Sequence, residues 1–565
     1  MIGVLARPEQ RASVEEFFEL FKTPWEHYRP GKSYDVVIVT ADTVPETDAR
    51  LIVILGSSPK QTERDLGVVA GSKRRDAVLA GGPDPLPIYG GLQTFRTSEE
   101  QRALLSVGDE VAAFQVGEPG HRTVRAGYDL FDEVSILLAA GQPVDFAPYC
   151  TLELHIEYLR KWMLGAGVSF FEIRAVPAGY DFIACLTHDI DFVGIRPHFV
   201  DHSMLGFVYR GTVGALRRFV RGRMSAARLL RCWSAVLSLP FVYAGWTKDF
   251  WEPFDWYLEA EKDLPTTYFL IPFKGVAGER VPGSQASRRA SAYGVSDIQQ
   301  SVQKLRGAGC EVGVHGLDSW HSVEKGCAEL KAITDASGAA SVGVRIHWLL
   351  QDENTPAVLE QAGYSYDSTC GFNECPGYRA GTTQVFRPPA AKKLLELPMH
   401  IQDGALFYPK RSNLSEAEAF ERCETMFANA ERFGGVVTLL WHDRSHGAER
   451  FWGDFYKELI GSLRARNVWF GSGAQVVEWF RSRREIRFEE ETTASGSREI
   501  GVSYRGPKPL HQFLVRVNLP HKDFATVPTE GAISEDIHWN GESGIVPNLR
   551  KLLEDANTSA IHPLT

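Results

Sequence analysis

The stretch FIACLTHDID, residues 182–191, joins a strand signal to two acidic side chains that are one residue apart. Residues 182–186 form an uninterrupted apolar run, which is typical of a strand buried on both faces. Asp189 and Asp191 follow at its carboxyl end. Burying two carboxylates so close together is costly unless a metal ion or a cationic group compensates for the charge. The stretch therefore predicts a charge-compensated site at the end of a buried strand.

Four later segments repeat this arrangement, with an ionisable side chain at or just beyond an apolar, strand-like run. They are EVGVHGLDSWH (311–321), VRIHW (344–348), LPMHIQD (397–403) and VTLLWHD (437–443). Strand-like and helix-like segments alternate from about 180 to 480, which predicts an α/β fold with mainly parallel strands. Chemistry in such folds gathers at the carboxyl ends of the strands. One such segment alone is explained by an ordinary core or surface residue, but five in succession favour one shared site.

In order and content these five segments resemble the polysaccharide deacetylases, carbohydrate esterase family 4, over roughly residues 180–480. The resemblance implies a distorted (β/α) barrel and a divalent metal ion, with zinc as the expected identity. It implies these roles: Asp189 as base, Asp191, His315 and His321 as metal ligands, Arg345 as the group that holds the base, Asp403 as the partner of the catalytic acid His442, and Leu440 and Trp441 as substrate-binding residues.

One position departs from the family pattern. The family places its second histidine ligand four residues after the first, and this chain has Ser319 there. Either His321 reaches the metal ion through a changed loop, or Asp318 or water replaces it. Three further histidines, namely His188, His347 and His400, are interpreted as structural or supporting residues.

The remaining sequence predicts two flanking regions. Residues 1–145 are expected to form an α/β domain, with strands at 36–39 and 51–55, and a helix at 152–164 leads into the next region. Residues 146–485 are the expected barrel, with a helical insertion at about 195–250. Short alternating runs after 485 predict a small β-sandwich-like module at 486–565.

The segment 205–246 interleaves arginines with apolar residues. Its arginines are Arg210, Arg217, Arg218, Arg221, Arg223, Arg228 and Arg231. A basic amphipathic helix can lie on a membrane surface. The interpretation favoured by the pattern alone is a helical insertion that packs on the barrel with its arginines solvated. Peripheral membrane contact is the alternative.

The bulk composition is that of a large globular protein, with 44% hydrophobic and 23% charged residues. The net charge of −10 disfavours nucleic acid as a partner. Eight scattered cysteines contain no C-x-x-C pair, which predicts reduced cysteines in an intracellular protein. The first residues contain no apolar segment of signal-peptide length, so a cytoplasmic location is expected.

The expected function is a metal-dependent hydrolase that removes N-acetyl groups from a carbohydrate, either a polysaccharide or a sugar precursor. Two alternatives stay open. The first is a C–N hydrolase of the same fold acting on a small non-sugar amide, because a fold does not determine a substrate. The second is a catalytically inactive module that binds a glycan or a partner.

Overall fold

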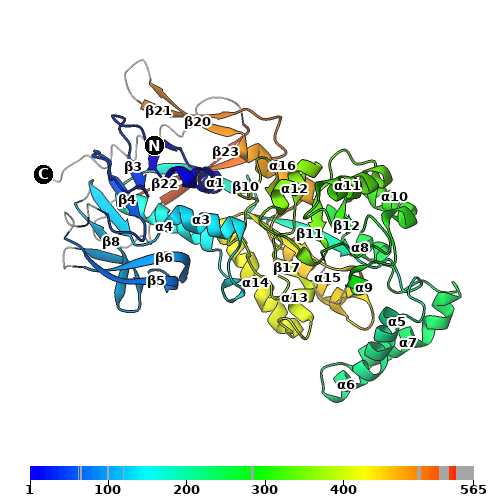
Figure 1. Cartoon of the computed structure of the whole chain (residues 1–565). Helices are drawn as coiled ribbons and strands as arrows, with labels where there is room; N and C mark the ends of the chain where they lie inside the picture. Colours follow the sequence, from blue (N-terminus) through cyan, green and yellow to red (C-terminus); the bar gives the residue numbers. More distant parts are fainter. Residues whose placement is uncertain are drawn as a thin grey trace.

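A computed structural model describes residues 1–60, 63, 67–97, 101–118, 120–280, 286–492, 498–520 and 533–541. Its architecture is a curled parallel sheet surrounded by helices, with a second large sheet beside it and a pair of helices projecting from one end (Figure 1). None of the helices in these ranges is long and apolar enough to cross a membrane.

The curled parallel sheet contains the strand of the stretch FIACLTHDID, residues 182–191. Its strand order is β16-β15-β14-β13-β12-β11-β18-β17, and β19 also pairs with β11. All these pairs are parallel. The strands are β11 (Phe182–Ile190), β12 (Thr266–Leu270), β13 (Glu311–Gly316), β14 (Val344–Ile346), β15 (Tyr366–Asp367), β16 (Leu395–Glu396), β17 (Ile401–Gln402), β18 (Val436–Leu440) and β19 (Val468–Phe470). The predicted α/β class with parallel strands is confirmed for this sheet.

Strand β11 is the centre of this sheet. All nine of its residues are buried, because β12 and β18 flank it and helices α14 (Glu416–Phe433) and α16 (Gly473–Arg484) contact it. The remaining helices around the sheet are α8 (Phe254–Ala260), α10 (Gln299–Gly307), α11 (Val323–Ser337), α12 (Thr355–Ala362), α13 (Asp403–Phe407) and α15 (Trp452–Arg464). A parallel sheet covered in this way needs near-continuous apolar strands, which explains the run at 182–186.

The first 126 residues supply a second sheet, of order β2-β1-β3-β4-β9-β8-β6-β5, with β7 paired to β8. Its strands are β1 (Ile2–Leu5), β2 (Trp25–His27), β3 (Val36–Val39), β4 (Leu51–Leu55), β5 (Val69–Leu79), β6 (Leu86–Arg96), β7 (Arg102–Val107), β8 (Glu110–Val116) and β9 (Arg122–Ala126). The predicted strands at 36–39 and 51–55 are confirmed, as is the helix at 152–164, which is α4 (Thr151–Gly165). Helices α1 (Arg11–Phe21) and α3 (Leu130–Ala139) contact each other beside this sheet.

The C-terminal strands are tied to the rest of the chain. Strand β22 (Phe513–Leu519) pairs antiparallel with β23 (Ile533–Trp539) and with β10 (Phe170–Pro177), which precedes the curled sheet in sequence. A separate hairpin joins β20 (Ile486–Thr492) and β21 (Arg498–Tyr504). Phe513 shares one buried cluster with Ile183 of β11 and Trp479 of α16. These strands therefore pack against the face of the curled sheet to which Ile183 points.

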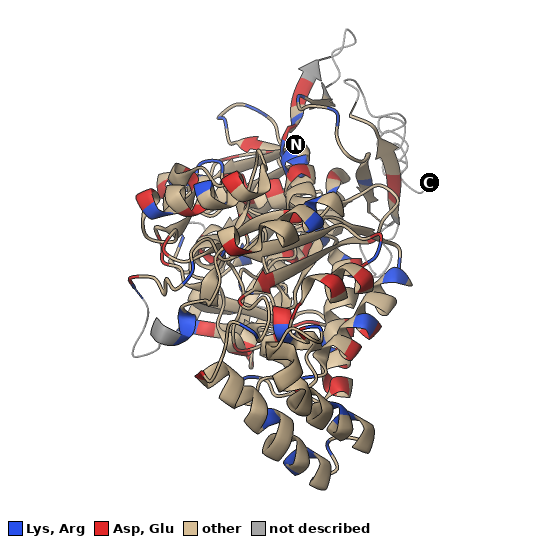
Figure 2. Ribbon diagram, turned by 90° about the vertical axis from the view of Figure 1, so that its right-hand side faces the viewer, with Lys and Arg blue, Asp and Glu red and all other residues tan. Residues whose placement is uncertain are grey.

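The helical insertion lies between β11 and α8. It consists of α5 (His202–Tyr209), a π-helical turn (Arg210–Gly214), α6 (Ala215–Val220) and α7 (Ala226–Tyr243). Figure 1 shows this insertion projecting at the lower right, and Figure 2 shows the same helices at the bottom of the molecule. It starts at the same strand end as the acidic pair, so the insertion lies beside the candidate site.

Candidate active site

The ionisable side chains predicted from the sequence gather at one edge of the curled sheet. Asp189 lies in β11 and Asp191 directly follows it, while His315 lies in β13. Asp403 begins α13 just after β17, and His442 follows β18. All these strands run parallel, so their carboxyl ends bring the side chains together.

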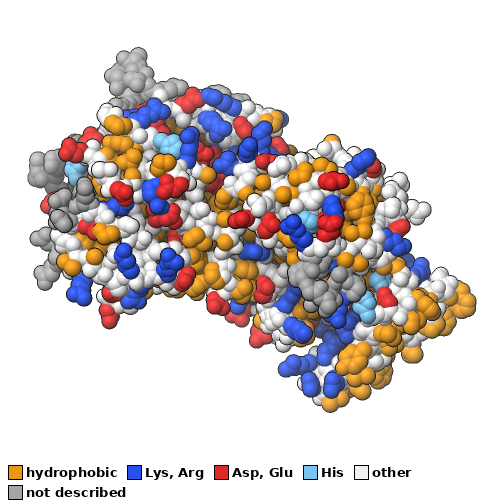
Figure 3. All heavy atoms as spheres, in the orientation of Figure 1, with side chains coloured by type: hydrophobic (Ala, Val, Ile, Leu, Met, Phe, Trp, Pro, Cys, Tyr) orange, Lys and Arg blue, Asp and Glu red, His pale blue; other side chains and the backbone are white. Residues whose placement is uncertain are grey.

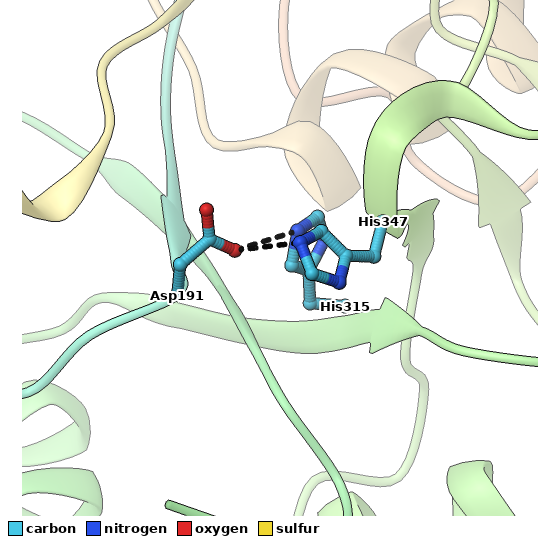
Figure 4. A group of neighbouring side chains, drawn as sticks. All are labelled: Asp191, His315 and His347. Atoms are coloured by element: carbon cyan, nitrogen blue, oxygen red, sulfur yellow. Dashed lines mark ion pairs between the residues drawn. The ribbon is translucent and has the colours of Figure 1, made fainter. Parts of the chain in front are cut away.

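Three side chains converge on one point. The Nε2 atoms of His315 and His347 lie 3.4 Å and 3.2 Å from Oδ1 of Asp191. Their possible ligand atoms all lie within 4.8 Å of one another (Figure 4). Ligand atoms about 2.0–2.1 Å from a tetrahedral ion would be about 3.3–3.4 Å apart. The distances from Oδ1 of Asp191 to the two Nε2 atoms therefore fit a single bound ion.

The chemistry of these side chains also fits a cation. Oδ1 of Asp191 is buried and has no hydrogen-bond donor among the described residues. Nδ1 of His315 lies 3.0 Å from the backbone oxygen of Arg345, which can only accept, so Nδ1 carries a proton and Nε2 is the ring nitrogen turned toward Asp191. Burial lowers the pKa of His347 to about 4, which keeps this imidazole neutral. Two neutral imidazoles and a carboxylate are typical ligands of catalytic zinc.

The backbone is strained directly after His347. Trp348 and Leu349 have φ angles of 69° and 55°, in the left-handed region that bulky residues rarely adopt. Each costs about 1–2 kcal/mol relative to the right-handed conformation. Both residues line the cavity described below. Strain of this kind gathers where a side chain must be held in one position, and here the neighbouring side chain is that of His347.

Asp189 is held by an arginine beside this group. Its Oδ1 accepts a hydrogen bond from Nη1 of Arg345 at 3.1 Å, and its Oδ2 lies 3.8 Å from Nε2 of His315. Arg345 is completely buried and also donates to the Thr187 hydroxyl at 2.7 Å and to the Ser368 hydroxyl at 2.7 Å. The guanidinium is fixed by these bonds, so it orients the Asp189 carboxylate.

His442 is paired with Asp403. Nδ1 of His442 lies 2.6 Å from Oδ1 of Asp403, and the backbone N–H of His442 donates to Oδ2 at 2.9 Å. Burial lowers the pKa of His442, but the Asp403 carboxylate outweighs it and raises the pKa to about 10. Burial raises the pKa of Asp403, yet the His442 cation brings it down to about 2. At neutral pH the pair is therefore an imidazolium held by a carboxylate.

A cavity of about 330 Å³ joins these groups. Asp189, Asp191, His315, His347, Leu440 and His442 line it. Five arginines line it as well, namely Arg210, Arg288, Arg289, Arg411 and Arg444. Positive side chains therefore outnumber the two carboxylates, and the protonated His442 adds to the excess. A cavity lined in this way attracts negatively charged ligands.

Some expected site residues lie elsewhere. Nε2 of His321 pairs with Oδ1 of Asp318 at 3.0 Å, and neither residue belongs to the converging group or lines the cavity. The same carboxylate accepts from the backbone N–H of Glu279 at 2.8 Å. In the structure His347 occupies the place in the group that was expected of His321. The physical reason is that His321 lies in the turn at 319–321, where Asp318 binds its ring.

Trp441 also differs from its expected role. Its side chain is completely buried and stacks on Tyr456, with 4.8 Å between ring centroids, and it does not line the cavity. Leu440, one residue earlier, does line it. Successive side chains of an extended segment point to opposite sides, so these two cannot both face the cavity.

The other two histidines have structural partners. Nε2 of His188 lies 2.7 Å from Oε1 of Glu261, behind β11. Nε2 of His400 faces the backbone oxygen of Thr382 at 3.2 Å. Sequence reasoning did not single out Asp443, whose Oδ1 accepts from the backbone N–H of Asp191 at 3.3 Å. Burial raises the pKa of Asp443 to about 7. This contact holds the segment that presents Asp191.

The signal that could have identified His347 is the two-residue period of a strand. Ile346 is extended, with φ −75° and ψ 128°, so His347 lies on the same side of the chain as Arg345. Arg345 was already expected to face the site. The same period places Asp191 on the side of Asp189.

No protein-family model and no curated protein sequence matches this chain. Among solved structures, a protein of Mycobacterium smegmatis assigned as a polysaccharide deacetylase aligns over 55% of this chain and 95% of its own, with 17% identity and a TM-score of 0.33. A Pseudomonas aeruginosa PAO1 protein with the same assignment aligns over 54% and 92%, with 15% identity and a TM-score of 0.32. PuuE allantoinase aligns over 53% and 90%, with 13% identity and a TM-score of 0.31. The chain is thus similar to polysaccharide deacetylases over about half of its length, at low identity and low TM-score.

Proposed function

We propose that this chain is a metal-dependent hydrolase that removes N-acetyl groups from a carbohydrate, and that the carbohydrate is anionic. The observation that carries the proposal is the arrangement around the cavity. A group of Asp191, His315 and His347 that fits a divalent cation shares one cavity with a carboxylate held by an arginine and an imidazolium held by an aspartate. Hydrolysis of an amide needs both a base for water and an acid for the departing nitrogen.

Asp191, His315 and His347 would hold the ion, for which zinc is the expected identity. When bound, it would supply Lewis acidity toward the amide carbonyl and acidify the attacking water. Asp189 accepts the proton of that water, and Arg345 orients its carboxylate for this step.

His442 acts on the other side of the scissile bond. Its pKa of about 10 means that it is protonated at neutral pH and can donate to the departing amine. This step is essential because an amide anion is too poor a leaving group. Asp403 fixes the ring and stabilises its charge. Leu440 lines the same cavity and would pack the acetyl methyl group.

The charges of the cavity favour an anionic sugar. Arg288 and Arg411 line it, and neither makes an ion pair with a described carboxylate. Nη1 of Arg411 lies 3.3 Å from Oε1 of Gln402, a neutral acceptor. A carboxylate or phosphate on the substrate would therefore find guanidinium groups that retain hydrogen-bonding capacity.

Cavity size favours a second candidate, a C–N hydrolase acting on a small non-sugar amide. A volume of about 330 Å³ is at the lower end of ligand-site volumes, roughly 300–1,000 Å³. The same Asp189 and His442 would act on such a substrate, so only the substrate separates the two candidates.

The test is acetate release by the full chain after loading with Zn²⁺. The substrates are an N-acetylated sugar bearing a carboxylate or phosphate, its uncharged counterpart, and small acyclic acetamides. The proposal predicts acetate from the charged sugar first, and none from any substrate in Asp191→Ala. Release from the small acetamides alone would favour the second candidate. An ion-free, inactive wild type would contradict both and support a binding module.

A further inference from the structure

The helical insertion exposes an unusual concentration of apolar surface. Eighteen large hydrophobic side chains are exposed in the described part of the chain, and thirteen of them lie between Phe199 and Trp246. Figure 3 shows this as a patch over the projecting helices at the lower right. Scattered exposed apolar residues need no explanation, but a contiguous patch marks an interaction surface.

Helix α7 has two apolar faces. The inner face packs in the molecule through Leu229, Cys232, Leu239 and Val242. The outer face carries Leu230, Trp233, Leu237 and Phe241, which are 63%, 38%, 74% and 48% exposed. The outer residues recur every three or four positions, so they form one stripe along the helix. A helix that only packs on the barrel needs the inner face alone.

The preceding helical rod repeats the pattern. Leu205, Tyr209, Val213, Leu216 and Val220 are all exposed, and each follows the previous one by three or four residues across α5, the π-helical turn and α6. Two antiparallel helical segments thus present two apolar stripes to solvent. The insertion packs on the body as the sequence pattern indicated, but the two stripes are additional to that packing.

The same segment is strongly basic. Residues 202–248 contain seven arginines, one lysine and no acidic residue, although the whole chain has a net charge of −10. Arg221, Arg223 and Arg231 are exposed and make no ion pair with described residues. Apolar stripes bordered by solvated arginines match the interface of an anionic bilayer, with its acyl boundary and phosphates.

The insertion is firmly attached to the body that carries the site. Sγ of Cys232 donates to the backbone oxygen of Ala448 at 3.1 Å, and Nη2 of Arg218 donates to that of Glu449 at 2.9 Å. His202 and Arg210 of the insertion line the cavity that Asp191 and His442 also line. Any external surface to which the insertion binds would therefore lie next to the cavity.

We propose that the helical insertion docks peripherally on an anionic lipid bilayer, with the outer stripes at the acyl boundary and the arginines at the lipid phosphates. A second copy of the chain fits this surface less well, because a symmetric contact would bring the same basic segments together. Docking would present the cavity to sugars carried by lipids. The docking itself can be measured without any activity, so it stands or fails independently of the proposed hydrolase.

The test is co-sedimentation of the full chain with vesicles of phosphatidylcholine alone and with 30% phosphatidylglycerol. We expect binding to the anionic vesicles that weakens with added salt. Leu230→Ser combined with Leu237→Ser should weaken it roughly ten-fold or more. The matched control is Val69→Ser combined with Leu510→Ser, which removes two similarly exposed apolar residues elsewhere and should leave binding unchanged.

A second variant tests the charges. Arg221→Gln, Arg223→Gln and Arg231→Gln together should weaken binding roughly ten-fold or more and reduce its dependence on salt. Light scattering of the free protein accompanies both series. Absence of binding to anionic vesicles, equal binding by the stripe variant and its control, or a dimer that the stripe variant converts to a monomer would each overturn the proposal.

Discussion

Asp191 is the residue on which the candidate metal site depends. Its Oδ1 is buried, receives no hydrogen bond from described residues, and faces the Nε2 atoms of two histidines. An ionised carboxylate that costs desolvation energy and lacks a donor is the arrangement that a cation would stabilise.

His347 and His321, whose positions in the structure differ from their expected roles, provide the first prediction. His347→Ala should reduce zinc bound per chain strongly, because it removes one of three converging ligand atoms. His321→Ala is the matched control and should leave zinc content unchanged, since its ring is bound to Asp318. Elemental analysis of the purified variants measures both. Loss of zinc from the His321 variant alone would reassign the site.

The His442–Asp403 pair predicts a pH dependence. Because its pKa is raised from 6.5 to about 10, His442 keeps its proton at neutral pH. As pH rises through about 10, His442 loses this proton and we expect activity to fall with it. By the same linkage, the stability contributed by this pair is complete between about pH 3.8 and pH 6.5; it disappears as pH rises through about 10 and His442 loses its proton, and as pH falls through about 2 and Asp403 gains one. In Asp403→Asn burial is no longer opposed by this carboxylate, so the alkaline limb should move down by about 1–3 units.

The measurement is a pH–rate profile of acetate release by wild type and Asp403→Asn. Glu458→Gln, an exposed carboxylate of α15, is the control and should keep the wild-type profile. An unchanged alkaline limb in Asp403→Asn would show that His442 is not the acid.

Arg411 provides a prediction about the substrate. Arg411→Gln should raise KM for the anionic sugar roughly ten-fold with little change in kcat, because a charge-assisted hydrogen bond is worth about 1.5–3 kcal/mol. KM for the uncharged counterpart should not change, and that substrate is the internal control. Equal effects on both substrates would exclude Arg411 from recognition of the charge.

At the scale of elements, the sequence predicted strands better than it predicted the loops that follow them. Apolar runs at 182–186 and 436–440 are sufficient to predict buried parallel strands, because both faces are covered. The five segments at strand ends were predictable for the same reason. The direction of a side chain after a strand is decided by the backbone there, which explains why His347 and Trp441 differ from their expected roles.

For a related reason, the sequence could not predict which face of the helical insertion is packed and which is exposed. The sequence of α7 is apolar at positions that belong to both faces, so the pattern alone cannot say which face is packed. Only the placement of Leu229 and Cys232 in the structure identifies the inner one. The outer stripe at Leu230 and Leu237 follows from it.

A buried network behind β11 ties several elements together. Oε1 of Glu261, next to α8, lies 2.7 Å from Nε2 of His188 in β11 and accepts from the Tyr456 hydroxyl of α15. Oε2 accepts from the Tyr268 hydroxyl of β12 at 3.4 Å. Glu261→Ala would leave these buried donors unpaired, at roughly 1–3 kcal/mol each.

We therefore expect Glu261→Ala to lower the free energy of unfolding by at least about 3 kcal/mol. The control is Glu259→Ala, an exposed residue of α8 that should change it by less than about 0.5 kcal/mol. Urea denaturation followed by circular dichroism compares the two. Similar midpoints for both variants would show that the network does not hold these elements.

At the scale of the whole molecule, the curled sheet unites the site, the insertion and the C-terminal strands. The site is at the carboxyl ends of its strands, and Phe513 of β22 packs with Ile183 under β11. His202 and Arg210 bring the insertion to the same cavity. The proposed function requires that a metal ion held with Asp191 and a base at Asp189 act together in this cavity.

The most direct test measures zinc content and acetate release together in wild type and Asp189→Asn. We predict one ion per chain in both proteins, because Asp189 is not among the three converging residues. Acetate release should fall about 10²–10⁴-fold in the variant, as expected for loss of a general base. Retention of acetate release by Asp189→Asn with its ion bound would contradict the account.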